Sequence, residues 1–209
     1  MNREIRKIYR RIVGVFRGHS SPPGLSEEIK EQLAESIQAF KNRTIHRTLT
    51  ELTINTTSDD DLIQIVFDNL SEKFGGNYEK EFETVASWNR SRQAIYLIWL
   101  LEAEVNNGGF NQFYFNSSGK FYPLLPSALR LVGATKFADL TEKANNTYEK
   151  EYENITSHYD GTLEGFSKSY EDNPLNEYDK TFYALCQVEN LPQLQVDYIR
   201  ENISDFADK

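Results

Sequence analysis

An uninterrupted apolar run at residues 94–101 constrains the fold of this 209-residue chain more than any other stretch. It reads Ala-Ile-Tyr-Leu-Ile-Trp-Leu-Leu and carries no charged side chain. A helix that is apolar on every side must be surrounded by other elements, because no face of it suits water. The run is also far shorter than the ~20 apolar residues that cross a membrane. We therefore expect a buried central helix over 88–106 in a soluble protein.

Helical periodicity continues on both sides of this run, with apolar residues recurring at intervals of three or four. Residues 44–57 are rich in β-branched side chains and are the one strand candidate, with an extended crossing as the alternative. A polar, turn-rich loop is expected at 157–173. The fold class is therefore all-α, a single multi-helix globular domain. Together with Ser, Pro and Gly residues that mark helix ends, the spacing predicts further helices over about 26–40, 58–74, 78–86, 122–132, 134–155, 174–188 and 192–203.

The net charge of −9 is divided unevenly. Residues 1–47 carry ten Lys or Arg and five Asp or Glu, a net charge of +5, whereas residues 48–209 carry thirteen against twenty-seven, a net charge of −14. We divide the chain into a basic amphipathic helical arm with its linker at 1–24 and an acidic helical domain at 25–209. The arm either docks on the acidic body, which the opposite charge favours, or attaches residues 1–17 to an anionic membrane surface or another chain.

Several kinds of site are not expected. The single cysteine, Cys186, rules out an internal disulfide and fits a reducing, cytoplasmic location, and its apolar neighbours predict a buried thiol. The three histidines are scattered, so no metal site and no cofactor are predicted. Three aspartates at 59–61 are expected to begin a helix, where backbone N–H groups accept them. An acidic body is also a poor direct binder of nucleic acid, since phosphates must be neutralised by cations.

The stretch 104–119 follows the apolar run and concentrates glycine, amide and aromatic residues. Glu104 lies in the last turn of the central helix, where the helix dipole disfavours an anion by ~0.3–1 kcal/mol. We expect its carboxylate to accept hydrogen bonds from the backbone N–H groups of a turn at 107–113. The alternative is that Glu104 contacts a ligand, a metal or an arginine of a partner.

Gly108 and Gly109 fit a helix terminus followed by close backbone approach. The aromatic side chains that follow are expected to be core anchors on a short helical turn, and the amides either satisfy the turn or point into a cleft. No nucleophile stands beside a base, so no catalytic residue is predicted. The alternative function is a small-molecule-binding protein or enzyme whose pocket lies here, and the residues of this motif are Glu104, Asn106, Asn107, Gly108, Gly109, Phe110, Gln112, Phe113 and Asn116.

Residues 104–119 read Glu-Val-Asn-Asn-Gly-Gly-Phe-Asn-Gln-Phe-Tyr-Phe-Asn-Ser-Ser-Gly. An apolar helix with Trp99 precedes this run, and a helix that ends near Gly133 follows it. The run resembles the signature of a bacterial family of DNA mimic proteins, most of them uncharacterised. The resemblance spans about 58–205 and leaves out 1–47. It implies an all-helical fold, homodimerisation, and an acidic surface that occupies the DNA-binding face of a transcriptional regulator.

These observations favour a non-enzymatic, cytoplasmic protein that binds a basic protein partner through its acidic C-terminal half. A row of helical carboxylates can imitate phosphates, which a duplex strand presents every ~3.4 Å of axis. Lysines at 143, 150, 168 and 180 interrupt the row, so an ordinary solvated surface is the competing interpretation. The predicted partner-binding residues are Glu149, Glu153, Asp160, Glu164, Glu171, Asp172, Glu177 and Asp179.

Overall fold

The computed structural model describes residues 27–208 of the chain, and the predicted arm at 1–24 lies outside them. The regular secondary structure of the described part is all helical, with no strand, which confirms the all-α class. Its α-helices are α2 (Glu27–Lys41), α3 (Glu51–Thr56), α4 (Asp59–Glu72), α5 (Glu81–Ser87), α6 (Arg90–Phe115), α7 (Leu125–Leu131), α8 (Thr135–Lys150), α9 (Tyr152–Thr156), α10 (Leu163–Lys168), α11 (Asn176–Leu185), α12 (Leu191–Glu201) and α13 (Ile203–Phe206), with 3₁₀ turns η1 (Tyr78–Lys80) and η2 (Ser117–Leu124).

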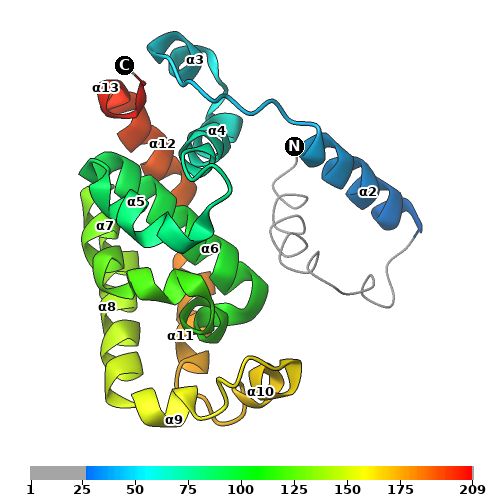
Figure 1. The fold of residues 1–209 in the computed structure, drawn as a ribbon, viewed down its shortest axis with the longest axis vertical. Helices are drawn as coiled ribbons and strands as arrows, with labels where there is room; N and C mark the ends of the chain where they lie inside the picture. The colour runs from blue at the N-terminus through cyan, green and yellow to red at the C-terminus, as the bar shows by residue number, and fades with distance from the viewer. Residues whose placement is uncertain (1–26, 209) are drawn as a thin grey trace.

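Helix α6 runs through the middle of the fold, as the apolar run predicts (Figure 1). It contacts α4, α7, α11, α13 and η2. Ala94, Ile95 and Ile98 are fully buried, and Leu97 and Leu101 are exposed by 1% or less. Helix α2 lies apart from the other helices and is joined to them by the crossing at 42–50 (Figure 1). Trp99 and Leu100 are only partly buried, so the helix is covered on most but not all of its surface, and the other helices pack around this covered part.

Three predictions of local structure are wrong. The strand candidate at 44–57 contains helix α3, because the side chain of Thr50 accepts a hydrogen bond from Thr53 N–H and caps it. The extended crossing applies only to the residues before it. The long helix predicted at 134–155 breaks into α8 and α9 at Glu151, whose φ of −103° and ψ of 20° are not helical. The loop at 157–173 contains α10, capped by the side chain of Thr162.

Cys186 is exposed, which corrects the prediction of a buried thiol. It directly follows α11 as the C-cap residue. The helix buries Phe182 and leaves the residues that follow Leu185 at the surface. The apolar residues near Cys186 in the sequence therefore do not enclose it, because the helix ends before the chain turns back toward the core.

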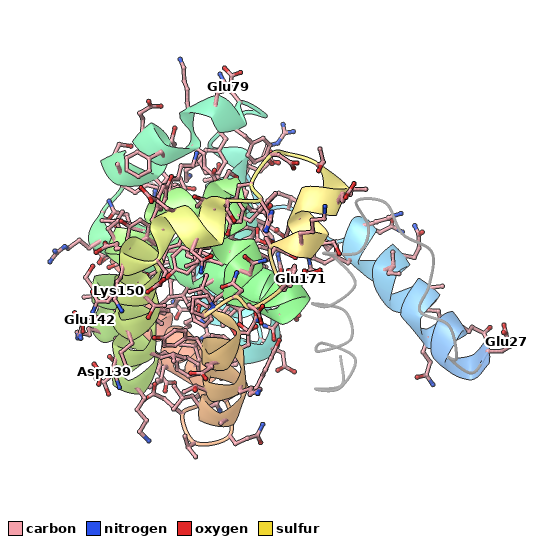
Figure 2. All side chains as sticks on the ribbon, turned by 90° about the horizontal axis from the view of Figure 1, so that it is seen from below. Glu27, Glu79, Asp139, Glu142, Lys150 and Glu171 are labelled. Atoms are coloured by element: carbon pink, nitrogen blue, oxygen red, sulfur yellow. The ribbon has the colours of Figure 1, made fainter. Side chains whose placement is uncertain are left out.

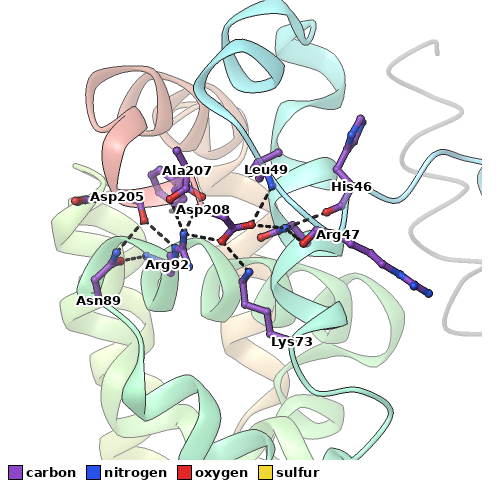
Figure 3. A network of polar contacts seen from close by, with 11 residues as sticks. His46, Arg47, Leu49, Lys73, Asn89, Arg92, Asp205, Ala207 and Asp208 are labelled. Atoms are coloured by element: carbon purple, nitrogen blue, oxygen red, sulfur yellow. Dashed lines mark hydrogen bonds and ion pairs between the residues drawn. The ribbon is translucent and has the colours of Figure 1, made fainter.

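Asp208, the last residue that the structure describes, is held by groups far away in the sequence (Figure 3). Its carboxylate accepts hydrogen bonds from Leu49 N–H at 2.9 Å, Asn69 Nδ2 at 3.1 Å, Lys73 Nζ at 2.9 Å and Arg92 Nη2 at 3.1 Å. These donors come from the 42–50 crossing, α4 and α6. Asp208 is thus tied to residues that lie more than 100 positions earlier in the sequence.

Because of these hydrogen bonds to the Asp208 carboxylate, we expect the stability of the fold to depend on pH. Burial alone would raise the pKa of Asp208, but the hydrogen bonds from Leu49 N–H, Lys73 and Asn69 outweigh it and lower the pKa from 3.8 to about 2. A carboxyl with a lower pKa in the folded state stabilises the fold above its unfolded pKa and loses that contribution as the pH falls through the folded value. We expect Asp208 to contribute about 1 to 2 kcal/mol at neutral pH, after allowance for solvent screening.

The measurement is urea unfolding of wild type and D208N between about pH 7 and pH 2. The stability difference between the two proteins should be constant down to about pH 4 and then shrink as the pH approaches 2. The exposed Asp197, which bonds only to Gln193 among the described side-chain contacts, supplies the control variant D197N. A difference between wild type and D208N that is independent of pH would contradict the assignment.

Candidate functional site

The motif at 104–119 changes the direction of α6 at two glycines. Gly108 (φ −148°, ψ 25°) and Gly109 (φ 73°, ψ −173°) have non-helical backbone, and the helix resumes at Phe110. The conformation of Gly109 lies in a region that glycine alone adopts readily. A Cβ added there would lie 2.2 Å from Asp179 Oδ2, and one added at Gly108 would lie 2.5 Å from the hydroxyl of Tyr170. The glycines therefore allow both an unusual turn and close side-chain approach.

Asp179 on α11 holds this turn. Its Oδ1 accepts a hydrogen bond of 2.8 Å from Phe110 N–H, at the start of the second half of α6. The hydroxyl of Tyr170 donates to Gly108 O at 2.8 Å, and the hydroxyl of Tyr183 donates to Val105 O at 2.9 Å. The prediction that Glu104 binds the backbone of this turn is therefore wrong. Sequence spacing does not identify Asp179 as the partner of Phe110 N–H, because the two residues are 69 positions apart.

Glu104 instead collects side-chain donors from the same motif. Its Oε2 accepts from Gln112 Nε2 at 2.6 Å and from Asn116 Nδ2 at 2.8 Å, and its Oε1 accepts from Ser118 Oγ at 3.3 Å. Asn107 Nδ2 donates to the amide oxygen of Gln112 at 2.8 Å. The polar groups considered as a pocket lining thus bind one another and join the two sides of the break in α6.

The aromatic residues of the motif are buried core anchors. Phe110 and Phe113 are each 1% exposed, and Tyr114 is 4% exposed. Tyr114 stacks on Tyr148 of α8 at a ring-centroid distance of 4.1 Å and donates to Asn145 Oδ1 at 2.7 Å. Burial raises the pKa of Tyr114 well above its usual value. These side chains attach the second half of α6 to α8.

A buried amide completes the motif. Asn111 is 1% exposed and its Nδ2 donates to Ser169 Oγ at 2.7 Å, while its Oδ1 accepts from Asn173 Nδ2 at 2.9 Å and Tyr159 OH at 3.1 Å. These partners lie on the chain between α9 and α11. Asn106 donates to Glu102 O at 2.6 Å, within its own helix. The motif therefore also orders the segment that carries most of the predicted acidic residues.

Seven of the eight predicted partner-binding carboxylates are exposed, and Asp179 is half-buried in the turn of α6. Thr162 hydrogen bonds lower the pKa of Asp160, so it stays ionised. Glu164 pairs with Lys168 at 2.7 Å. Figure 2 shows Asp139 and Glu142 of α8 on the same side of the molecule as Lys150. These two carboxylates bind Arg130 at 3.2 and 2.7 Å, and the prediction did not include them.

The exposed members of the predicted set are Glu149, Glu153, Asp160, Glu164, Glu171, Asp172 and Glu177, which we call the acidic end. Residues 151–179 carry eight Asp or Glu and one Lys, a net charge of −7, which is half of the −14 of residues 48–209. Helices α9 and α10 lie at one end of the long axis, and α3 lies near the other (Figure 1). The predicted surface is therefore localised at one end of the fold.

The described residues offer little for other chemistry. Among them, no three His, Cys, Asp or Glu side chains are grouped to hold a metal ion. Within that part of the chain, no helix has both the length and the apolar character to cross a membrane. A polar hollow of about 40 Å³ lies beside His158 and Glu171 and is lined by no residue of the 104–119 motif. Such a volume has room for one or a few water molecules.

Comparison with known proteins gives one family match. The model of a family described as DMP19-like protein matches residues 86–202, somewhat more than half of the chain. The matched residues include α6 with its glycine break and all of the acidic end. No curated protein and no solved structure matches the chain.

Because of the break in α6 at Gly108 and Gly109, we expect a side chain at position 109 to lower the free energy of unfolding strongly. G109A combines a strained positive φ with a contact that forces Asp179 away from Phe110 N–H. Gly76 also has a positive φ, +79°, but has no atom within 4 Å of its missing Cβ, so G76A is the matched control. We expect G76A to lose about 1 to 2 kcal/mol and G109A at least about 2 kcal/mol more in urea unfolding. Equal losses of stability in G76A and G109A would contradict the role of the close contact between Gly109 and Asp179.

Asp179 predicts a pH dependence of the opposite sign to that of Asp208. Burial raises the pKa of Asp179 above 3.8, against the lowering effect of Phe110 N–H. A carboxyl group whose pKa is higher in the folded protein than in the unfolded one contributes to stability at low pH, because the folded protein holds the proton more tightly. This contribution is lost as the pH rises. The variant D179N keeps an acceptor for Phe110 N–H without the buried charge.

Unfolding experiments at about pH 3 and about pH 7 should show D179N gaining stability relative to wild type at the higher pH. D179A, which removes the acceptor, should be less stable than D179N at both values because Phe110 N–H is left unpaired. If D179N and D179A are equally stable, the hydrogen bond does not hold the turn.

Proposed function

Because the chain belongs to the family of DMP19-like proteins, we propose that it is a non-enzymatic cytoplasmic protein that binds a basic protein partner as a DNA mimic. The partner would be a DNA-binding regulator, and the homodimer that the resemblance implies is part of the proposal. The observation that carries it is the acidic end, where half of the net charge of residues 48–209 lies within residues 151–179. A surface of this sign attracts the basic face with which a regulator binds phosphates.

The acidic end has carboxylates available to a partner. Glu153, Glu171, Asp172 and Glu177 are exposed and form no ion pair within residues 27–208. Nearby lysines are partly neutralised, since Lys168 binds Glu164 and Lys150 lies 3.4 Å from Glu151. Two of the four lysines that interrupt the row, Lys150 and Lys168, are therefore paired with carboxylates other than these four.

These four carboxylates lie on several elements and not on a single helix. Helix α8 itself is electrically balanced, with three acidic and three lysine side chains. The free carboxylates come instead from α9, the turn before α11 and the first turn of α11. A duplex presents two phosphate rows on a curved surface, and carboxylates from several elements can follow such a surface.

The alternative of a small-molecule or catalytic pocket at 104–119 has weaker support. Glu104, Asn107, Gln112 and Asn116 bind one another, and their aromatic neighbours fill the core. We assign these four polar residues a structural role, because they join the two sides of the break in α6.

The test is capture of proteins from a cell lysate on the immobilised full-length chain, followed by elution with duplex DNA. The proposal predicts a basic, DNA-binding protein that is retained at low salt and eluted by duplex DNA. Changing Glu153, Glu171 and Glu177 to Gln together with Asp172 to Asn should reduce its retention at least about tenfold, because several desolvated charge pairs are lost.

The matched control changes Glu51, Glu79, Glu83 and Glu201 to Gln, which alters the net charge by the same amount on exposed residues outside the acidic end. The control should retain the partner almost as well as wild type. Equal losses in the two variants would show that only net charge matters, and a partner that duplex DNA does not elute would contradict mimicry.

A further inference from the structure

Leu163, the first residue of α10, is an apolar side chain exposed to water within the segment that carries most of the acidic end. It is 77% exposed and does not pack on the hydrophobic core. Residues 151–179 around it carry eight Asp or Glu and one Lys. A single exposed leucine is common on protein surfaces, so the meaning of this one depends on what holds it in place and on what surrounds it.

The loop that presents Leu163 is held by hydrogen bonds on both sides of it. Asp160 Oδ1 accepts from Thr162 N–H at 2.9 Å and from Thr162 Oγ1 at 2.7 Å, and Thr162 Oγ1 accepts from Gly165 N–H at 2.9 Å. A Cβ added at Gly165 would lie 2.2 Å from Asp160 Oδ1, so the loop closes tightly at this glycine. The backbone of Leu163 is therefore fixed before a partner binds, which reduces the ordering cost of a contact there.

Helix α10 is attached to the fold by another side chain. The ring of Phe166 contacts the ring of Phe115 on α6 at a centroid distance of 4.8 Å and the ring of Tyr170 at 5.2 Å. Leu163 takes no part in these ring contacts, and a leucine that stays in water adds no burial to the stability of the fold. The folding of this segment therefore does not explain an apolar residue at position 163.

The DNA-binding face of a regulator is not uniformly basic. Lys and Arg contact the phosphates, and other side chains between them contact the edges of the bases. Apolar side chains in this second group pack against the methyl group of thymine in the major groove. A mimic made only of carboxylates would leave such apolar side chains without a partner, whereas an exposed leucine among carboxylates can cover one of them.

Starting from the proposed function, we propose that Leu163 is the apolar contact of the partner interface. It packs against an apolar, base-contacting side chain of the regulator, while the carboxylates of the acidic end bind the Lys and Arg that otherwise contact phosphates. The partner is then a regulator that contacts bases in the major groove, and not a protein that binds the DNA backbone alone. The carboxylates attract basic faces in general, and Leu163 selects among them.

Leu52 provides a matched control in a different charge environment. It is 72% exposed and lies in the first turn of α3, a six-residue helix capped by the side chain of Thr50, as α10 is capped by that of Thr162. Residues 42–57 carry two Arg and one Glu, a net charge of +1. Helix α3 also lies near the opposite end of the long axis from α10 (Figure 1).

The experiment measures the affinity of full-length wild type, L163Q, L163M and L52Q for a purified probe. The probe is the protein that wild type captures and duplex DNA elutes. The four chains have the same net charge, and all should unfold at the same urea concentration because the two positions are exposed. L163Q should bind the probe about tenfold more weakly than wild type, because an apolar contact is lost. L163M and L52Q should bind within about twofold of wild type, since methionine keeps the apolar contact.

Salt separates the apolar contact from the charged ones. The loss of affinity in L163Q should be the same at about 50 mM and about 300 mM salt, because screening acts on charges. The loss caused by changing Glu153, Glu171 and Glu177 to Gln and Asp172 to Asn should shrink as the salt concentration rises.

Three results would overturn the role of Leu163 and leave the acidic surface as proposed. They are equal affinities of L163Q and L52Q, a loss of affinity in L163M as large as in L163Q, and a loss in L163Q that disappears at the higher salt concentration. If wild type captures no protein that duplex DNA elutes, the proposed function itself fails, and the role of Leu163 fails with it.

Discussion

The hydrogen bond from Phe110 N–H to Asp179 allows one helix to supply both the centre of the core and the attachment of the C-terminal helices. A continuous α6 would carry the aromatic side chains of its second half in one fixed direction. The break at Gly108 and Gly109 redirects them toward α8 and α11, and Asp179 supplies the acceptor that the interrupted helix lacks. The direction of the second half of α6 therefore depends on a single hydrogen-bond acceptor at position 179.

The sequence predicts the parts of this fold whose cause is local. The apolar run at 94–101 requires burial wherever it lies, and the two glycines mark the break regardless of their partners. Burial of Phe110, Phe113 and Tyr114 follows from their spacing on one helical face. The same reasoning fails at 44–57, where the capping of α3 by Thr50 outweighs the β-branched composition.

The parts that sequence does not predict are partnerships between distant residues. Glu104 and Asp179 are both acidic and both lie near the glycine break, but nothing in their local sequence decides which binds the backbone. In the sequence, Asp179 cannot be told apart from the acidic residues near it, and only the packing of α11 places it against the break in α6. The exposure of Asp139 and Glu142 on α8 is visible in the periodicity, whereas their sharing of Arg130 depends on how α7 meets α8.

The packing of α4 bears on where this domain begins. Leu62, Val66 and Leu70 are each exposed by 1% or less, and α4 contacts both α6 and α12. A fragment limited to residues 86–202 would keep the glycine motif and the acidic end but would leave the apolar sides of α6 and α12 uncovered. A piece of this chain that keeps these sides of α6 and α12 covered therefore includes α4, and the family match at 86–202 is shorter than the packed helical unit.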